Sequence, residues 1–358
     1  MKTAIVLFNL GGPDRPEAVK PFLFNLFNDR AIINLPQPFR WLVAKLISTR
    51  RAPVAQEIYA HLGGKSPLLD HTKAQAQALE QALGTLVPEL GTVKSFIAMR
   101  YWHPRADECA ASVRAWHPDQ IILVPLYPQF STTTTQSSVT EWHKAAKFVE
   151  LKAPTKTLCC YPEEPGFINA MADLVAQKID QASEASDNPY RLLLSAHGLP
   201  QKVVDGGDPY QKQVERTGNA LIKSLAQKGY DNLDSVICYQ SRVGPLEWIG
   251  PSTDDEVIRA GKDQVSIVMV PIAFVSEHSE TLVELDIEYQ ELADEHKVPH
   301  YFRASTVLTE DKFINGLADQ VRKVAAQNFV CDEKNGCGLE GQQDGPEKLS
   351  TFLASGMH

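Results

Sequence analysis

Short runs of apolar residues alternate along the chain with longer stretches in which apolar residues recur at helical spacing. The helical stretches are too long for hairpin connections, so the apolar runs are expected to form parallel strands, with helices covering both faces of the sheets. The expected strands are 3–9, 94–99, 120–126, 155–160, 191–196, 234–239, 265–271 and 299–303, and the expected helices include 70–83, 105–115, 166–182, 210–228 and 307–328.

The eight expected strands form two sets of four with similar local sequences. IVLFNLGGP at 5–13 is similar to LLLSAHGLP at 192–200, and ILVPLYPQFSTTTTQS at 122–137 is similar to VMVPIAFVSEHSETLV at 268–283. The repetition predicts an α/β protein with two similar Rossmann-like domains, each a four-stranded parallel sheet flanked by helices. We expect the N-terminal domain at 1–160, a linking helix and linker at 161–189, the C-terminal domain at 190–330 and a tail at 331–358.

The N-terminal domain carries an insertion, at about 14–66, directly after its first strand. Its segment 21–53 is apolar and aromatic and is interrupted by prolines and arginines. Ordinary helical packing is one interpretation of this composition. The other is a hydrophobic lip around a large flat ligand, resting on a membrane surface.

The segment PIAFVSEHSETLVELDIEY, residues 271–289, begins as an apolar strand and continues as an acidic run. On an α-helix four carboxylates would share one face, whereas Asp286 would lie on the opposite face. Carboxylates three or four residues apart repel one another and weaken a helix. The run is therefore either a solvated acidic face near a helix N-terminus or a track for a hydrated divalent cation. The four acidic residues are Glu277, Glu280, Glu284 and Glu288.

Polar side chains gather where the expected strands end, which in open parallel sheets is where ligands bind. His197 ends one strand of the second domain, and the acidic run follows another. A neutral imidazole can accept a proton or bind a metal at neutral pH. The sequence has no HExxH motif and no paired CxxC, so the metal site is expected to be open and weak rather than a closed zinc site.

The charge and cysteine content narrow the classes of function. The chain has 358 residues and a net charge of −9, which argues against a nucleic-acid partner and is compatible with handling cations. The N-terminal MKTAIVLFNLGGPD is interpreted as the first strand rather than a signal peptide, and no stretch of about twenty apolar residues occurs. We therefore expect a cytoplasmic protein whose six cysteines form no disulfide framework.

Six segments together resemble the ferrochelatase family, whose members insert ferrous iron into protoporphyrin IX in the last step of haem synthesis. The resemblance runs in order from about residue 3 to about residue 328, and it implies the chelatase-like fold with two similar α/β domains. The segments are FNLGGPD, RYWHP, YPQFSTTTTQSS, SAHGLP, CYQSRVGPLEWIGPSTDD and PIAFVSEHSETLVELDIEY.

The resemblance implies a role for each of the site residues. His197 is similar to the family's site histidine, which receives protons or metal on one face of the macrocycle. Glu280 and His278 resemble the opposing catalytic pair, and the implied metal ligands are His197, Glu280, Glu284 and Glu288. The implied porphyrin contacts are Leu10, Tyr127 and Trp248 against the ring, Arg100 and Tyr101 at the inner site, and Arg51, Tyr59, Ser66 and Ser241 at the propionates.

Many family members bind a 2Fe–2S cluster through cysteine thiolates, and this sequence departs from one common arrangement. Thr132 occupies the position of a cysteine shortly after YPQFS, and the C-terminal group CDEKNGCG contains no CxxC. A second arrangement takes a cysteine from the middle of the chain, where neighbouring residues of a strand would face opposite sides. A cluster or simple reduced thiols are both compatible with the candidate ligands Cys159, Cys160, Cys331 and Cys337.

Other functions fit part of the same residue set. An enzyme of the same fold could act on coproporphyrin III, or insert cobalt into a precorrin-type ring. A non-catalytic haem or metal carrier would need a strong axial ligand but no acidic column. The resemblance implies protoporphyrin IX and Fe²⁺ as substrates. The sequence leaves open a monomer or a homodimer, and the composition of the insertion suggests peripheral contact with the inner face of the cell membrane.

Overall fold

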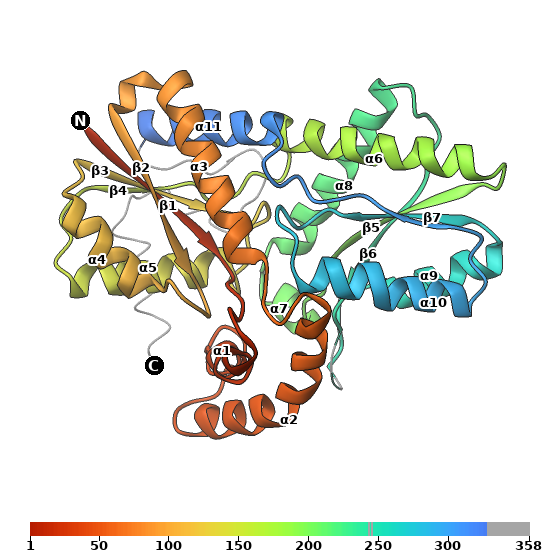
Figure 1. The fold of residues 1–358 in the computed structure, drawn as a ribbon, viewed down its shortest axis with the longest axis horizontal. Coiled ribbons are helices and arrows are strands. Elements are labelled where there is room, and N and C mark those ends of the chain that lie inside the picture. The colour runs from red at the N-terminus through yellow and green to blue at the C-terminus, as the bar shows by residue number, and fades with distance from the viewer. Residues whose placement is uncertain (243, 245, 328–358) are drawn as a thin grey trace.

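The computed structural model describes residues 1–242, 244 and 246–327, and its strands form two parallel four-stranded sheets (Figure 1). The strand order is β2-β1-β3-β4 in the first sheet and β6-β5-β7-β8 in the second, so the two sheets have equivalent topologies. The predicted duplicated α/β fold is confirmed. The strands are β1 (Lys2–Asn9), β2 (Thr92–Met99), β3 (Gln120–Pro125), β4 (Thr155–Thr157), β5 (Tyr190–His197), β6 (Asp234–Gln240), β7 (Ser266–Pro271) and β8 (Tyr301–Arg303).

The central strands are apolar along almost their whole length because helices cover both faces of each sheet. In β1 every residue after Lys2 is buried, and in β7 all residues are buried. The parallel register pairs Val6 with Leu123 in the first sheet and Leu194 with Val270 in the second. Continuous apolar runs were therefore a reliable signal for the strands of this chain.

Two helices are exchanged between the sheets. Helix α6 (Pro165–Ala185) follows the first sheet in the chain, but it packs against β7, β8 and α8 of the second. Helix α11 (Asp311–Ala326) follows the second sheet, but it packs against β3, β4 and α3 of the first. The two helices also contact each other, and in Figure 1 they lie along the top of the molecule. The segment 161–189, expected to be a linking helix and linker, supplies a core helix to the second sheet.

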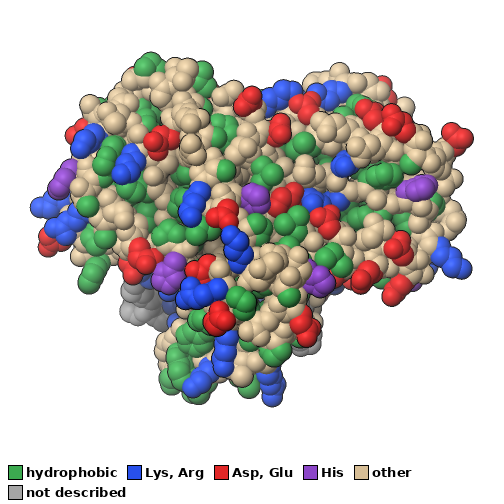
Figure 2. All heavy atoms as spheres, in the orientation of Figure 1, with side chains coloured by type: hydrophobic (Ala, Val, Ile, Leu, Met, Phe, Trp, Pro, Cys, Tyr) green, Lys and Arg blue, Asp and Glu red, His purple; other side chains and the backbone are tan. Residues whose placement is uncertain are grey.

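The insertion after β1 contains two helices, α1 (Val19–Phe27) and α2 (Phe39–His61), which lie below the sheets in Figure 1. We call residues 14–66 the lip. Its small core joins Phe22 and Tyr59 to Trp102, which follows β2. The outer side of the lip keeps large apolar side chains exposed, and Figure 2 shows them together with basic side chains at the bottom of the molecule.

The ends of several elements differ from those predicted because buried loops are also apolar. The fourth strand ends at Thr157 rather than at 160, although the following residues are buried. Helix α11 begins at Asp311 rather than at 307. No helix in the described part of the chain is long and apolar enough to cross a membrane. The other helices are α3 (Leu68–Leu86), α4 (Ala106–Trp116), α5 (Thr135–Phe148), α7 (Gln201–Asp205), α8 (Tyr210–Gln227), α9 (Thr253–Asp263) and α10 (Tyr289–Glu295).

Candidate active site

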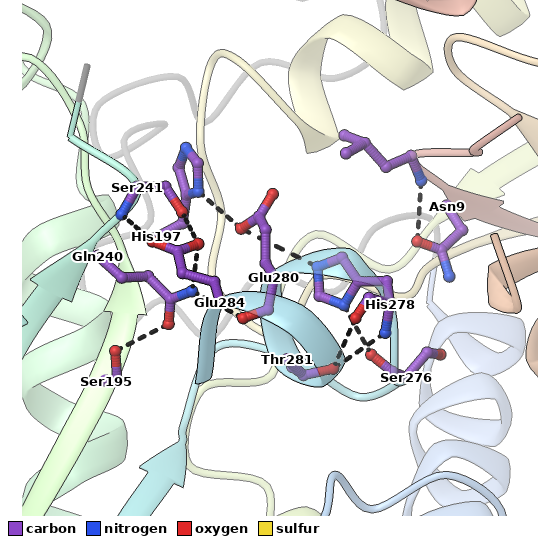
Figure 3. A network of polar contacts seen from close by, with 11 residues as sticks. Asn9, Ser195, His197, Gln240, Ser241, Ser276, His278, Glu280, Thr281 and Glu284 are labelled. Atoms are coloured by element: carbon purple, nitrogen blue, oxygen red, sulfur yellow. Dashed lines mark hydrogen bonds and ion pairs between the residues drawn. The ribbon is translucent and has the colours of Figure 1, made fainter. Parts of the chain in front are cut away.

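His197 and Glu280 meet at the carboxyl end of the second sheet (Figure 3). His197 is the last residue of β5, and Glu280 begins a π-helical segment, Glu280–Glu288, that follows β7. Because β5 and β7 are parallel neighbours, their carboxyl ends lie at the same edge of the sheet. His197 Nδ1 lies 2.8 Å from Glu280 Oε2, so the ring N–H donates a hydrogen bond to the carboxylate.

The pairing of His197 with Glu280 sets the protonation of both groups. Burial alone would lower the pKa of His197, but the Glu280 carboxylate holds it above its ordinary value. Burial alone would raise the pKa of Glu280, but His197, and to a smaller extent His278, lower it to about 2. The His197 side chain is 39% exposed. The site therefore combines a charged carboxylate with an imidazole that a substrate can reach.

Glu284 lies one turn further along the same segment and is held by three donors. Its carboxylate accepts hydrogen bonds from Gln240 Nε2 at 3.0 Å, the Ser241 N–H at 2.8 Å and Ser241 Oγ at 2.5 Å. Ser241 has φ 60, a left-handed backbone conformation that lets its N–H and hydroxyl reach the same carboxylate. Burial and the Glu280 charge raise the pKa of Glu284 to about 7. Glu284 can therefore gain or lose a proton near neutral pH.

His278 lies on the other side of Glu280. Its Nδ1 is 3.1 Å from the carbonyl oxygen of Ser276, and its Nε2 is 4.0 Å from Glu280 Oε2 (Figure 3). The ring also meets Phe274 edge-on, with 4.7 Å between the ring centres. Burial lowers the pKa of His278, so the ring is neutral at neutral pH. Because the carbonyl of Ser276 only accepts, the hydrogen is on Nδ1 and the Nε2 lone pair faces Glu280.

Glu277 does not belong to the acidic face that the helical spacing predicted. It precedes the helix and is buried, and its carboxylate accepts from Arg303 Nη1 at 2.8 Å and from the Thr306 N–H at 2.9 Å. Arg303 also pairs with Asp286, at 2.5 and 2.6 Å. Glu277 and Asp286 were expected on opposite faces, but both neutralise one arginine behind the site. The prediction was wrong because the helical period was applied to a residue that lies before the helix begins.

The remaining three carboxylates run from the interior to the surface. Glu280 and Glu284 are partly buried, whereas Glu288 is exposed. Burial and the nearby Glu291 raise the pKa of Glu288. No group of three or more histidine, cysteine, aspartate or glutamate side chains within the described residues could hold one metal ion. The carboxylates are therefore arranged as successive single positions rather than as a closed metal cage.

Comparison with known proteins identifies the family. The ferrochelatase family model matches residues 2–325. The chain is 54% identical to the ferrochelatase of Caulobacter vibrioides over 321 residues, which cover 90% of each chain. It is 48% identical to the ferrochelatase of Rickettsia bellii over 352 residues, 98% of this chain and 95% of that one. The chain belongs to the ferrochelatase family.

The predicted resemblance to ferrochelatases is therefore confirmed, and with it the class of lyases that insert iron. Among solved structures, SirB from Bacillus subtilis with Fe³⁺ is similar to this ferrochelatase with a TM-score of 0.50. The match covers 91% of this chain and 96% of that chain at 14% sequence identity. At this identity the likeness concerns the fold alone.

Two residues of this ferrochelatase that we expected at the propionates connect the lip to the sheet ends. Tyr59 of α2 is buried. Burial raises the pKa of its hydroxyl to about 12, although a hydrogen bond with Ser279 has the opposite effect. Ser66 is buried against Gly12, where an added Cβ would come within 2.5 Å of the Ser66 side chain. Only glycine fits at position 12, and the end of the lip therefore packs closely onto the turn after β1.

Arg100 and Tyr101, expected at the inner site, join a network that the sequence did not indicate. Arg100 donates to Asp29 Oδ2 at 2.6 Å and to Ser137 Oγ at 2.6 Å, and it also pairs with Glu141. Tyr101 is buried and donates its hydroxyl to the same Asp29 oxygen at 2.8 Å. Asp29 lies in the lip just after α1. A single acid after a helix has no distinguishing pattern, so the sequence had no signal for it.

The expected ring contacts lie after strands of the two sheets, whereas Arg51 lies on the lip. Trp248 is half-buried beside Gly198, where an added Cβ would lie 3.3 Å from the indole ring. Leu10 is half-buried against the lip core, and Tyr127 packs against the core of the first sheet. Arg51 is exposed on α2, with its guanidinium 6.0 Å from the centre of an aromatic ring of α1.

Two of the four candidate cluster ligands lie within the described residues. Cys159 and Cys160 follow β4 and are buried together with Phe130. A hydrogen bond with Cys160, and burial, raise the pKa of the Cys159 thiol well above its ordinary value. The two thiols meet, and the alternation of a strand does not apply to them because the strand ends before them. Cys331 and Cys337 lie outside the described residues.

Proposed function

We propose that this ferrochelatase inserts ferrous iron into protoporphyrin IX, forming protohaem and releasing two protons. The observation that carries the proposal is the contact of 2.8 Å between His197 and Glu280 at the shared end of β5 and β7. Insertion requires loss of two pyrrole protons, removal of water from the metal and distortion of a stiff ring. Family membership supports the reaction, and this contact supports a proton acceptor at the site.

The His197–Glu280 pair is suited to receive pyrrole protons. His197 donates through Nδ1 to Glu280, so its Nε2 is the nitrogen that faces a proton or a metal ion. The Glu280 carboxylate stabilises the imidazolium that forms when Nε2 accepts a proton. His278 is neutral and turns its Nε2 toward Glu280 at 4.0 Å, which adds a second acceptor.

Glu284 and Glu288 extend a path for the incoming metal. The path begins at the exposed Glu288, continues at Glu284 and ends at Glu280. Carboxylate and imidazole ligands suit Fe²⁺ without the tight binding that thiolates give. Because the pKa of Glu284 is about 7, a proton competes with the cation at this position near neutral pH. This competition favours passage of the metal over its retention.

The porphyrin is assigned to the space between the lip and the sheet ends. Leu10, Tyr127 and Trp248 are assigned to the ring. Arg51 and Tyr59 are assigned to the propionates, since arginine pairs with carboxylates through two parallel hydrogen bonds. Ser66 and Ser241 are further propionate contacts, and Arg100 and Tyr101 lie at the inner end.

Anaerobic mixing of the purified protein with Fe²⁺ and protoporphyrin IX, followed by absorbance, tests the function. We expect free porphyrin to disappear and haem to form much faster than in the same mixture without protein. Coproporphyrin III in a parallel series tests the alternative substrate. Haem formation from coproporphyrin alone would replace the proposed substrate, and binding of porphyrin without metal insertion would indicate a carrier.

We propose that the outer side of the lip contacts an anionic membrane surface from the cytoplasm. Its exposed apolar side chains include Phe39, which is 61% exposed, together with Trp41 and Leu42. Between residues 30 and 56 the sequence has five basic residues and no acidic one. Apolar side chains with surrounding positive charge are typical of peripheral membrane-binding surfaces. The basic residues are Arg30, Arg40, Lys45, Arg50 and Arg51.

Replacing Phe39 and Trp41 by serine is expected to reduce co-sedimentation with anionic vesicles severalfold, because the variant has less apolar area to bury in the interface. Iron insertion into solubilised porphyrin is expected to stay within about twofold of the wild type. Phe148→Ser is the matched control, since Phe148 is an aromatic residue 86% exposed on a different part of the surface. Equal sedimentation of all three proteins would contradict the membrane contact.

A 2Fe–2S cluster bound by Cys159, Cys160, Cys331 and Cys337 stays a prediction. The donor chemistry fits, because Cys159 and Cys160 are neighbouring thiols that meet in one place. Such a cluster supplies a thiolate cross-link between the middle of the chain and its C-terminal segment. The other two candidate ligands lie outside the described residues, so the absorption spectrum of the protein is the test.

Protein purified without oxygen is expected to be reddish-brown, with the charge-transfer bands of a 2Fe–2S cluster. Cys337→Ser is expected to bleach these bands, because one of four thiolate ligands is lost. Cys109→Ser is the control, since Cys109 is buried in a different core of the first domain. A colourless wild-type protein in which all four candidate thiols can be titrated would exclude the cluster.

A further inference from the structure

Gln75 connects the first half of the chain to the segment that carries His278. It lies on α3 and is fully buried, with all of its partners in the second half. Its Nε2 donates to the carbonyls of Val275 at 2.8 Å and Leu308 at 3.0 Å, and its Oε1 accepts from Ser276 Oγ at 2.9 Å. Two carbonyl acceptors and one hydroxyl donor determine which end of the carboxamide carries the nitrogen.

Ser276 passes this restraint on to His278. The Ser276 carbonyl accepts from His278 Nδ1 at 3.1 Å, and the other ring nitrogen, Nε2, lies 4.0 Å from Glu280 Oε2 (Figure 3). The backbone N–H of His278 donates to Thr281 Oγ1 at 3.0 Å, which restrains the backbone that carries the ring. A continuous series of contacts thus leads from Gln75 on α3 through Ser276 to His278 and Glu280.

We propose that Gln75 is a positioning residue for iron insertion, which holds the backbone at Ser276 so that the His278 ring stays beside Glu280. The inference rests on the role proposed above for His278. Without the carboxamide, the Ser276 hydroxyl and the Leu308 carbonyl lose their buried partner, and the segment can relax away from α3. The Ser276 carbonyl then no longer selects one tautomer of His278. A displacement of the His278 ring is expected to be costly, since a shift of about 1 Å at a reacting centre can lower a rate about 100-fold.

A second buried glutamine shows what a purely structural link between the halves would do. Gln129, after β3, donates to Thr217 Oγ1 at 2.9 Å and to the Ile272 carbonyl at 3.2 Å. It is buried like Gln75 and also joins the first half to the second. Its hydrogen bonds do not involve Ser276 or His278. Gln129→Met is therefore a matched control that removes buried hydrogen bonds between the halves but none that Ser276 or His278 makes.

The test compares the full-length Gln75→Met and Gln129→Met variants by thermal unfolding, steady-state kinetics and histidine ¹⁵N spectra. We expect both variants to lower Tm. Only Gln75→Met is expected to lower kcat, by at least about tenfold at a KM for porphyrin within about twofold of the wild type. The His278 ring is expected to change from a single Nδ1–H tautomer to a mixture in this variant alone. The double variant Gln75→Met/Ser276→Ala is expected to be no slower than Gln75→Met, because both changes break one series of contacts.

A wild-type kcat and an unchanged His278 tautomer in Gln75→Met would make Gln75 a structural link only and overturn the proposal. Should Gln75→Met not fold, Ser276→Ala removes a single hydrogen bond to Gln75 and is judged by the same two readouts. His278→Phe separates this inference from the proposed function. If His278→Phe keeps the wild-type kcat, the role of His278 fails and the inference fails with it. If His278→Phe is slow and Gln75→Met is fast, the inference alone is overturned.

Discussion

His197→Ala is expected to lower the rate of iron insertion at least about 100-fold while the protein stays folded and still binds porphyrin. The variant loses the ring nitrogen that we propose as the acceptor of a pyrrole proton, and it leaves the Glu280 carboxylate without its partner at 2.8 Å. Porphyrin binding is expected to persist because we assign the contacts with the porphyrin ring to other residues. Anaerobic kinetics and a fluorescence titration with porphyrin measure the two properties separately.

His103→Ala is the matched control for this variant. His103 Nδ1 lies 2.8 Å from Glu108 Oε2, the same separation as between His197 and Glu280, but both side chains are exposed on the first domain. Insertion by His103→Ala is expected to equal that of the wild type. Turnover near the wild-type rate in His197→Ala would overturn the assignment of His197, whatever the control does.

The pH dependence of stability gives a second readout for His197. Because pairing with Glu280 raises the pKa of His197 in the folded protein, the pair stabilises the fold fully at pH values below the ordinary histidine pKa. This contribution is lost as the pH rises through the raised pKa. The difference in Tm between wild type and His197→Ala is therefore expected to be largest in mild acid and to shrink under alkaline conditions.

Glu280→Gln is expected to remove most of the insertion activity, with a loss of about 100-fold or more, because it deletes one negative charge at nearly constant shape. The neutral amide neither stabilises the His197 imidazolium nor attracts Fe²⁺. The Glu280 charge also raises the pKa of Glu284, so the pKa of Glu284 is expected to fall below about 7 in this variant. Turnover with Fe²⁺ and the pH profile of the remaining activity measure both effects.

Asp286→Asn is the control for Glu280→Gln. The contacts of Asp286 in the structure predict a loss of stability, but not of activity, in this variant. Asp286 pairs with Arg303 through both carboxylate oxygens, so its loss is expected to destabilise the fold by on the order of 1 kcal/mol. Its effect on kcat is expected to stay within about twofold, because its carboxylate is directed to Arg303 rather than to Glu280. Equal losses of activity in the two variants would show that the acidic segment acts only through its total charge.

The strand content and the duplicated topology could be predicted from the sequence because the physics behind them is local. A parallel strand buried on both faces requires a continuous apolar run, and β1, β5 and β7 are such runs. The meeting of His197 and Glu280 at one sheet edge could be predicted because the carboxyl ends of parallel strands lie together. Apolar runs were less informative about where elements end, since Cys159 and Cys160 are buried in a loop.

The sequence by itself therefore determined the two sheets, the position of the lip and the residues gathered at the sheet ends. The tertiary structure alone decided which of these residues are partners. Glu277 and Asp286 share Arg303, Asp29 binds Arg100, and Gln75 binds Ser276 across the two halves. A hydrogen bond between residues far apart in the chain depends on how the sheets and helices pack. Such a pair produces no periodicity or fixed spacing in the sequence, because the residues next to each partner along the chain do not determine which distant residue it contacts.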